Sequence, residues 1–191
     1  MSKIAKVKPY TIENGDGIRV SIFFSGCEHY CKNCFNSELW DFNIGETFSR
    51  EYYENKIKPL IKDYINGISL IGGEPFHPKN FLDTYRLIHQ FFLDFPGKTI
   101  WVYTGYEYEY LHSSQYLLEL CEATQNRIPT MFLLHSIFYY IHVLVDGKFI
   151  EEKKQLRLAY RGSTNQRIID VQKSLRENKV ILYKEWFNEN T

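Results

Sequence analysis

The chain has 191 residues and balanced charge, with 23 lysines and arginines against 23 aspartates and glutamates. This length is that of one domain with a sizeable core, so we expect a single domain over residues 1–191. Balanced charge provides no long-range field for nucleic acid or an anionic membrane, and neither is expected as a partner. Aromatic residues make up 17% of the chain, a content that argues against disorder.

Strands and helices are expected to alternate along the chain. β-branched and aromatic residues predict buried strands, each followed by a glycine-containing turn, at residues 18–24, 67–71, 99–103 and 141–145. Apolar residues at helical spacing predict helices at residues 50–64, 78–95, 107–125 and 168–175. Residues 180–183 predict a last strand or a tail.

Two of these helices carry more detailed predictions. Ser49 is placed to cap the first helix, whereas Pro59 would kink or split it. In the second helix one side is apolar and predicted to be buried, with Phe81, Tyr85, Ile88 and Phe92.

Strand, glycine turn and helix recur in order, which predicts an α/β fold with a parallel sheet. Right-handed crossovers would place the four turns at the same edge of that sheet. This pattern does not distinguish an open sheet from a barrel.

The compartment follows from two negative features and one ambiguous segment. The N-terminal residues 1–8 lack the apolar stretch of a signal peptide, and clustered cysteines without an export signal favour a reducing interior. We therefore expect a cytoplasmic protein.

Residues 128–145 carry no formal charge, but they contain Pro129 and two histidines, so we predict a buried helix or loop leading into a core strand and no membrane span.

Three of the four cysteines, Cys27, Cys31 and Cys34, follow the first predicted strand with the spacing C-x3-C-x2-C. Thiolates suit zinc, copper(I) and iron–sulfur clusters. Structural zinc takes four ligands, and a [4Fe–4S] cluster held by three cysteines keeps one iron open. A zinc site that borrows His29, redox-active thiols and simply buried thiols remain alternatives. Cys121 lies among apolar residues of a predicted helix and is expected to be a small buried hydrophobe.

The cysteine loop resembles the cluster-binding loop of the radical S-adenosylmethionine (SAM) enzymes. Further motifs follow in order at residues 14–19 (NGDGIR), 35–36, 40–41, 72–75 (GGEP), 103–106 (YTGY), 145–149 (VDGKF) and 161–167 (RGSTNQR). This series, over about residues 8–168, is similar to that of the activating enzymes of glycyl-radical proteins, in particular those of anaerobic ribonucleotide reductase.

The resemblance implies a fold and a reaction. The fold is a partial (βα) barrel of parallel strands, open on one side, followed by a tail of about residues 169–191. The reaction is that of an oxidoreductase: a reduced [4Fe–4S] cluster cleaves SAM to methionine and a 5′-deoxyadenosyl radical. That radical takes hydrogen from a glycine of anaerobic (class III) ribonucleotide reductase. An activase of pyruvate formate-lyase type and a non-catalytic zinc-binding interaction domain are the alternatives.

The resemblance also implies the ligands. Cys27, Cys31 and Cys34 bind three irons of one cluster, and the amino and carboxylate groups of SAM bind the fourth. The remaining SAM contacts are assigned to Gly72, Gly73, Glu74, Thr104, Asp146 and Lys148. Asp146 could also bind a monovalent cation. The electron donor is a flavodoxin-like protein by analogy, and a homodimer is left open.

Several positions carry weaker expectations. Many relatives have an aromatic residue beside the adenine where this chain has Asn33, so any stacking ring, such as Phe35, must come from elsewhere. His29 is expected at the surface or behind the cysteine ligands. For three arginines, Arg19, Arg161 and Arg167, binding of the SAM carboxylate or of the partner and ordinary loop hydrogen bonding are equally open.

Overall fold

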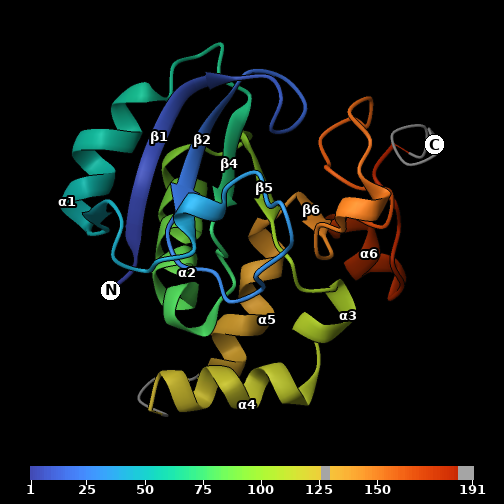
Figure 1. Cartoon of the computed structure of the whole chain (residues 1–191). Helices are drawn as coiled ribbons and strands as arrows, with labels where there is room; N and C mark the ends of the chain where they lie inside the picture. Colours follow the sequence, from blue (N-terminus) through green and yellow to red (C-terminus); the bar gives the residue numbers. More distant parts are fainter. Residues whose placement is uncertain (126–129, 185–191) are drawn as a thin grey trace.

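The computed structural model describes residues 1–125 and 130–184 (Figure 1). Within these residues the strands form one seven-stranded sheet in the order β3-β1-β2-β4-β5-β6-β7. The four central neighbours run parallel: β2 (Arg19–Phe24), β4 (Gly67–Gly72), β5 (Thr99–Tyr103) and β6 (Val143–Asp146). Antiparallel strands flank them: β1 (Lys3–Thr11) and β3 (Glu46–Thr47) on one side, and β7 (Arg167–Asp170) on the other. The fold is mixed α/β with a mostly parallel sheet, which confirms the predicted class.

Helices cover one face of the sheet. Figure 1 shows α2 (Pro78–Asp94) and α5 (Thr130–Tyr140) behind the strands, and α4 (Ser114–Ala123) packs against both helices. The main core lies between this face and the helices and includes Ile22, Leu70, Val102, Leu144, Phe81 and Phe91. The uncharged stretch becomes α5 followed by β6, as predicted, although residues 128 and 129 lie outside the described part. In the described residues no helix has the length and apolar character needed to cross a membrane.

The opposite face of the sheet holds a buried arginine at the beginning of the parallel strands. Arg19 is fully buried and lies 5.5 Å from the ring centre of Trp101. Its guanidinium donates to Ser69 Oγ at 2.8 Å and to Thr99 Oγ1 at 2.8 Å, and further to backbone carbonyls. Of the two roles left open for Arg19, the structure supports internal hydrogen bonding at the edge away from the cysteines.

Proline and a capping serine divide two of the predicted helices. Ser49 caps α1 (Arg50–Tyr52) as predicted, but the chain then continues as a π turn and a 3₁₀ turn that ends at Leu60. Pro59 lacks an N–H and its ring clashes with the preceding turn, so a regular helix to residue 64 cannot form. The predicted helix 107–125 is two helices, α3 (Tyr108–Leu111) and α4, because Ser113 caps a new start by accepting from the amide of Tyr116.

Three further predictions were wrong. The strand predicted as first is the second, because β1 precedes it with irregular pairing and several exposed positions that hide its alternation. Residues 168–170 belong to β7, and α6 (Val171–Glu177) starts only after them, capped by Asp170. Phe92 on α2 is 39% exposed, and Leu87 and Phe91 are buried in its place. Residues 180–183 form only a single bridge, Ile169 to Leu182, and the tail residues 185–191 lie outside the described part.

Candidate functional site

The turns that follow the four parallel strands meet at one edge of the sheet and border a cavity of about 320 Å³. The three clustered cysteines come from the turn after β2, and the glycine turns come from the other strands. The lining residues with sequence predictions are Cys27, His29, Cys31, Cys34, Phe35, Gly72, Gly73, Glu74, Thr104, Gly105, Gly147 and Arg161. The prediction that these turns gather at one edge is therefore confirmed.

The cysteine loop has a tightly determined backbone. Gly26 has φ +91°, and a Cβ there would lie 2.0 Å from the ring of Phe42, so only glycine fits. The amides of Gly26 and Cys27 donate to the carbonyls of Leu39 and Trp40 at 2.8 and 3.1 Å, which fastens the loop to the segment that follows it. Asn33 has φ +54°, a left-handed conformation that asparagine tolerates well. The loop is thus folded back on itself with its three thiols on the cavity wall.

The three thiols differ in their exposure to solvent. Cys27 is buried, and Cys31 and Cys34 are half-buried. Burial, and next the Glu74 carboxylate, raise the pKa of Cys27 to about 12, and burial also raises the pKa of Cys31. Ionising a buried thiol costs free energy unless a bound cation compensates the negative charge. Iron supplies that positive charge, and iron–sulfur clusters take soft thiolate ligands.

The described residues form no ligand set for a single metal ion. Among residues 1–125 and 130–184, no three His, Cys, Asp or Glu side chains surround one metal position. In a cluster each cysteine binds a different iron, so the sulfurs need not converge on one point. Three separate thiols on one wall fit that group.

Glu74 joins the turns after β2, β4 and β5. Its side chain is 1% exposed, and Oε2 accepts from the Gly105 amide at 2.7 Å and contacts His29 Nε2 at 2.9 Å. Oε1 accepts from the Phe76 amide at 2.9 Å, and the Glu74 amide donates to the Gly26 carbonyl at 2.8 Å. The carboxylate is used within the protein, so a ligand at this turn would meet mainly its backbone.

Of the two placements expected for His29, the surface and a position behind the cysteine ligands, its burial excludes the surface. Its side chain is 10% exposed and lines the cavity, with its ring edge-on to Tyr106 at 4.5 Å between centroids. A Cβ on Gly105 would lie 2.3 Å from His29 Cδ2, so the imidazole rests directly on this glycine. Nε2 contacts Glu74, so in the zinc alternative His29 would bind the metal through Nδ1. No local pattern indicated this burial.

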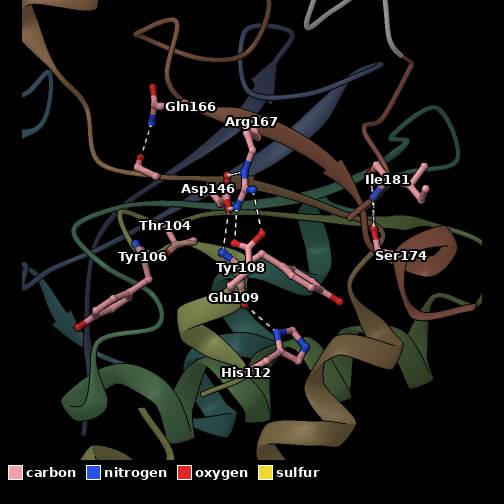
Figure 2. A network of polar contacts seen from close by, with 11 residues as sticks. Thr104, Tyr106, Tyr108, Glu109, His112, Asp146, Gln166, Arg167, Ser174 and Ile181 are labelled. Carbon is pink, nitrogen blue, oxygen red and sulfur yellow. Dashed lines mark hydrogen bonds and ion pairs between the residues drawn. The ribbon is translucent and has the colours of Figure 1, made fainter. Parts of the chain in front are cut away.

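Asp146 and Lys148 do not line the cavity. Asp146 is 1% exposed, and Figure 2 shows it facing Arg167 of β7. Oδ1 accepts from Arg167 Nε at 3.0 Å, and Oδ2 accepts from Arg167 Nη2 at 2.5 Å and from the Tyr108 amide at 2.8 Å. Lys148 is exposed, and its carbonyl accepts from Asn165. Contacts of Asp146 and Lys148 with SAM, and of Asp146 with a cation, stay predictions.

Arg167 extends this network to α3. Its Nη1 and Nη2 donate to the two carboxylate oxygens of Glu109 at 2.9 and 2.6 Å (Figure 2). Hydrogen bonds to Asp146 and Glu109 raise the pKa of Arg167, and the guanidinium lowers the pKa of Glu109. Arg167 therefore ties the end of β6 and the start of β7 to α3.

The other predicted contacts divide between the cavity and the surface. Thr104 is buried, lines the cavity and accepts from the Tyr106 amide at 3.1 Å. Asn33 is exposed and outside the lining, whereas Phe35 lines the cavity and packs against Phe149 at 5.2 Å between centroids. The aromatic residues that line the cavity with the cysteines are Phe35, Trp40, Tyr103, Phe149 and Tyr160.

Several lining residues were not predicted. They include Glu13, Asn14, Tyr103, Gln155, Leu156, Leu158 and Tyr160. The Tyr103 hydroxyl is buried and has no hydrogen-bond partner among the described residues. Asn14 and Tyr103 lie in motifs noted above, but the residues from 155 to 160 carry no motif, and only the course of the loop brings them to the cavity.

Comparison with known proteins gives consistent matches. A family model described as a 4Fe-4S single cluster domain matches residues 13–169. The anaerobic ribonucleoside-triphosphate reductase-activating protein of Salmonella typhi is 38% identical over 160 residues, covering 83% of this chain and 92% of the relative. The protein of the same name from Escherichia coli K12 is 37% identical with the same coverage, and that of Enterobacteria phage T4 is 31% identical over 85% of this chain and 90% of the relative.

Proposed function

The chain belongs to the family of anaerobic ribonucleoside-triphosphate reductase-activating proteins, and from this we propose that it is a radical SAM activating enzyme. Cys27, Cys31 and Cys34 hold one [4Fe–4S] cluster, and the protein substrate is anaerobic ribonucleotide reductase. In this proposal the sheet is the partial (βα) barrel of a single-domain cytoplasmic enzyme, and a flavodoxin-like protein supplies the electron.

One observation carries the proposal. Three thiols and the glycine-rich turn at residues 72–74 line the same cavity at the carboxyl edge of the parallel strands. When bound, the reduced cluster supplies one electron that breaks the C5′–S bond of SAM, giving methionine and a 5′-deoxyadenosyl radical that takes a hydrogen atom from the target glycine.

The chain's own residues bind and orient. A Cβ on Gly73 would lie 2.6 Å from the Gly26 carbonyl oxygen, and Gly72 has φ +104°, so this turn packs closely on the cysteine loop without side chains. Its backbone can therefore approach the amino acid part of SAM closely. Thr104 and Gly105 form the neighbouring wall, and Phe35 offers a ring to the adenine.

The mouth of the cavity suits a protein substrate. Leu156 is 86% exposed and Phe35 is 58% exposed, and both line the cavity. In this proposal the target glycine arrives on a loop of the partner, and the exposed Leu156 and Phe35 contact its flanks.

The test uses anaerobically reconstituted protein. We expect dithionite reduction to give an EPR signal of a [4Fe–4S] cluster that changes on addition of SAM, together with formation of 5′-deoxyadenosine. Cys27→Ser, Cys31→Ser and Cys34→Ser should abolish both, whereas Cys121→Ser, on α4 and outside the cavity lining, is the matched control.

The partner is tested in the same experiment. Anaerobic ribonucleotide reductase should acquire a glycyl-radical EPR signal, and pyruvate formate-lyase should not. A protein that binds one zinc, gives no EPR signal and does not cleave SAM would refute the enzyme and support the interaction domain.

A further inference from the structure

We propose that His29 and Glu74 act as a positioning pair that holds the cysteine loop in the conformation required for cluster binding. The inference rests on the proposed cluster at Cys27, Cys31 and Cys34, but it concerns two side chains that would not themselves bind iron. Their Nε2 and Oε2 atoms lie 2.9 Å apart at the cavity wall.

The position of His29 within the loop makes it suited to this role. It lies between Cys27 and Cys31, so fixing its side chain fixes the backbone that joins two of the three thiols. The imidazole is held on three sides: by Glu74, by the edge-on ring of Tyr106 and by the α-carbon of Gly105.

Glu74 is the fixed end of the pair. Burying a carboxylate to 1% exposure costs free energy unless hydrogen bonds satisfy its oxygens. The Glu74 carboxylate accepts hydrogen bonds from the amides of Gly105 and Phe76 and also contacts His29. Among the described residues no lysine or arginine forms an ion pair with it. The two side chains are hydrogen-bonded to each other, so loss of either one leaves the other incompletely bonded in a buried place.

The consequence is preorganisation of the loop. Glu74 is bonded to the turn after β5 through Gly105 and to the start of the cysteine loop through Gly26, while His29 extends this support to the middle of the loop. Hydrogen-bonded partners behind metal ligands typically change metal affinity about 10- to 100-fold when removed.

The test measures the rate at which a chelator removes iron from reconstituted protein. His29→Phe keeps a ring against Tyr106 but cannot donate a hydrogen bond. Glu74→Gln keeps the size of the side chain but replaces one of its two acceptor oxygens with an NH₂ group. We expect each to speed iron loss about 10-fold or more. The double variant should be no faster than the more affected single variant, because the two residues act as one unit. His29→Gln retains a donor and should restore most of the stability of the cluster.

Two controls separate positioning from a general loss of structure. Glu28→Gln makes the same chemical change in the same loop, but the Glu28 contacts, His77 at 3.2 Å and Lys79 at 3.1 Å, lie outside the cavity lining. It should lose iron at the wild-type rate. In cluster-free protein, hydrogen exchange of the Gly105 amide should speed up in Glu74→Gln, a readout that needs neither cluster nor activity and that remains informative if His29→Phe fails to fold.

The outcomes distinguish this inference from the proposed function. Iron loss at the wild-type rate in His29→Phe and Glu74→Gln, or full additivity in the double variant, would overturn the positioning pair even while the wild type cleaves SAM. A wild-type protein that binds no cluster would instead refute the proposed function.

Discussion

Replacing Arg167 by Met tests the network that joins β6, β7 and α3. Methionine keeps an unbranched chain but cannot donate hydrogen bonds. The change removes the two hydrogen bonds that Arg167 donates to Asp146, whose side chain is 1% exposed. The hydrogen bond from the Tyr108 amide to this carboxylate, at 2.8 Å, remains. It also removes the two bonds from Arg167 to Glu109.

The expected cost follows from the burial of each partner. Removing one member of a buried ion pair typically costs about 3–5 kcal/mol, because the remaining charge is left without compensation. The Arg167 side chain is 33% exposed, so water can approach the carboxylate, and the low end, about 3 kcal/mol, applies. Glu109 is 57% exposed, so its pair with Arg167 adds at most about 1 kcal/mol. For a domain of this size, 3 kcal/mol corresponds to a fall in Tm of roughly 6–12 °C.

Thermal and denaturant unfolding of the cluster-free protein measures this effect. The double variant Asp146→Asn/Arg167→Met should be more stable than Arg167→Met, since it removes the uncompensated charge along with its partner. Glu109→Gln serves as the exposed control and should lower Tm by less than about 4 °C. A fall of less than about 2 °C in Arg167→Met, or a double variant less stable than Arg167→Met, would refute the reasoning.

Three further outcomes are expected. Gly105→Ala places a Cβ 2.3 Å from His29 Cδ2, so the imidazole must move, and iron loss to a chelator should speed up; an unchanged rate would contradict the tight contact. Leu156→Asp, at a position 86% exposed on the cavity mouth, should lower glycyl-radical formation on the reductase more than it lowers SAM cleavage; an equal loss of both would argue against docking there. Burial lowers the pKa of His142 below 6.5, and Nδ1 accepts from the Ile100 amide at 3.2 Å. His142 therefore stabilises the fold at a pH above its pKa in the unfolded chain. This contribution to the unfolding free energy is lost as the pH falls through the pKa of His142 in the folded protein, by up to about 1.4 kcal/mol per pH unit. His142→Asn should flatten the pH dependence of the unfolding free energy between pH 7 and 5. A slope equal to that of the wild type would show that the pH dependence does not arise from His142.

Local patterns determined much of the architecture and of the site. Runs of β-branched and aromatic residues marked β2, β4, β5 and β6, because a strand buried on both faces requires apolar residues throughout. The order of strands, glycine turns and helices then placed the cysteines and the glycine turns at one sheet edge, since parallel strands share their carboxyl ends. The spacing of Cys27, Cys31 and Cys34 is likewise local, and it was enough to predict a soft-ligand metal site.

The tertiary structure alone decided where polar side chains point. Glu74 and His29 are 45 residues apart in the chain, and Arg167 and Glu109 are 58 apart, so no periodicity or short motif could pair them. For the same reason the sequence assigns Asp146 to a glycine turn but does not pair it with Arg167. Local spacing predicts a helix at residues 168–170, whereas pairing with β6 makes them a strand. Backbone patterns report which face of an element is buried, whereas a hydrogen bond across the fold depends on distances that only the packed chain sets.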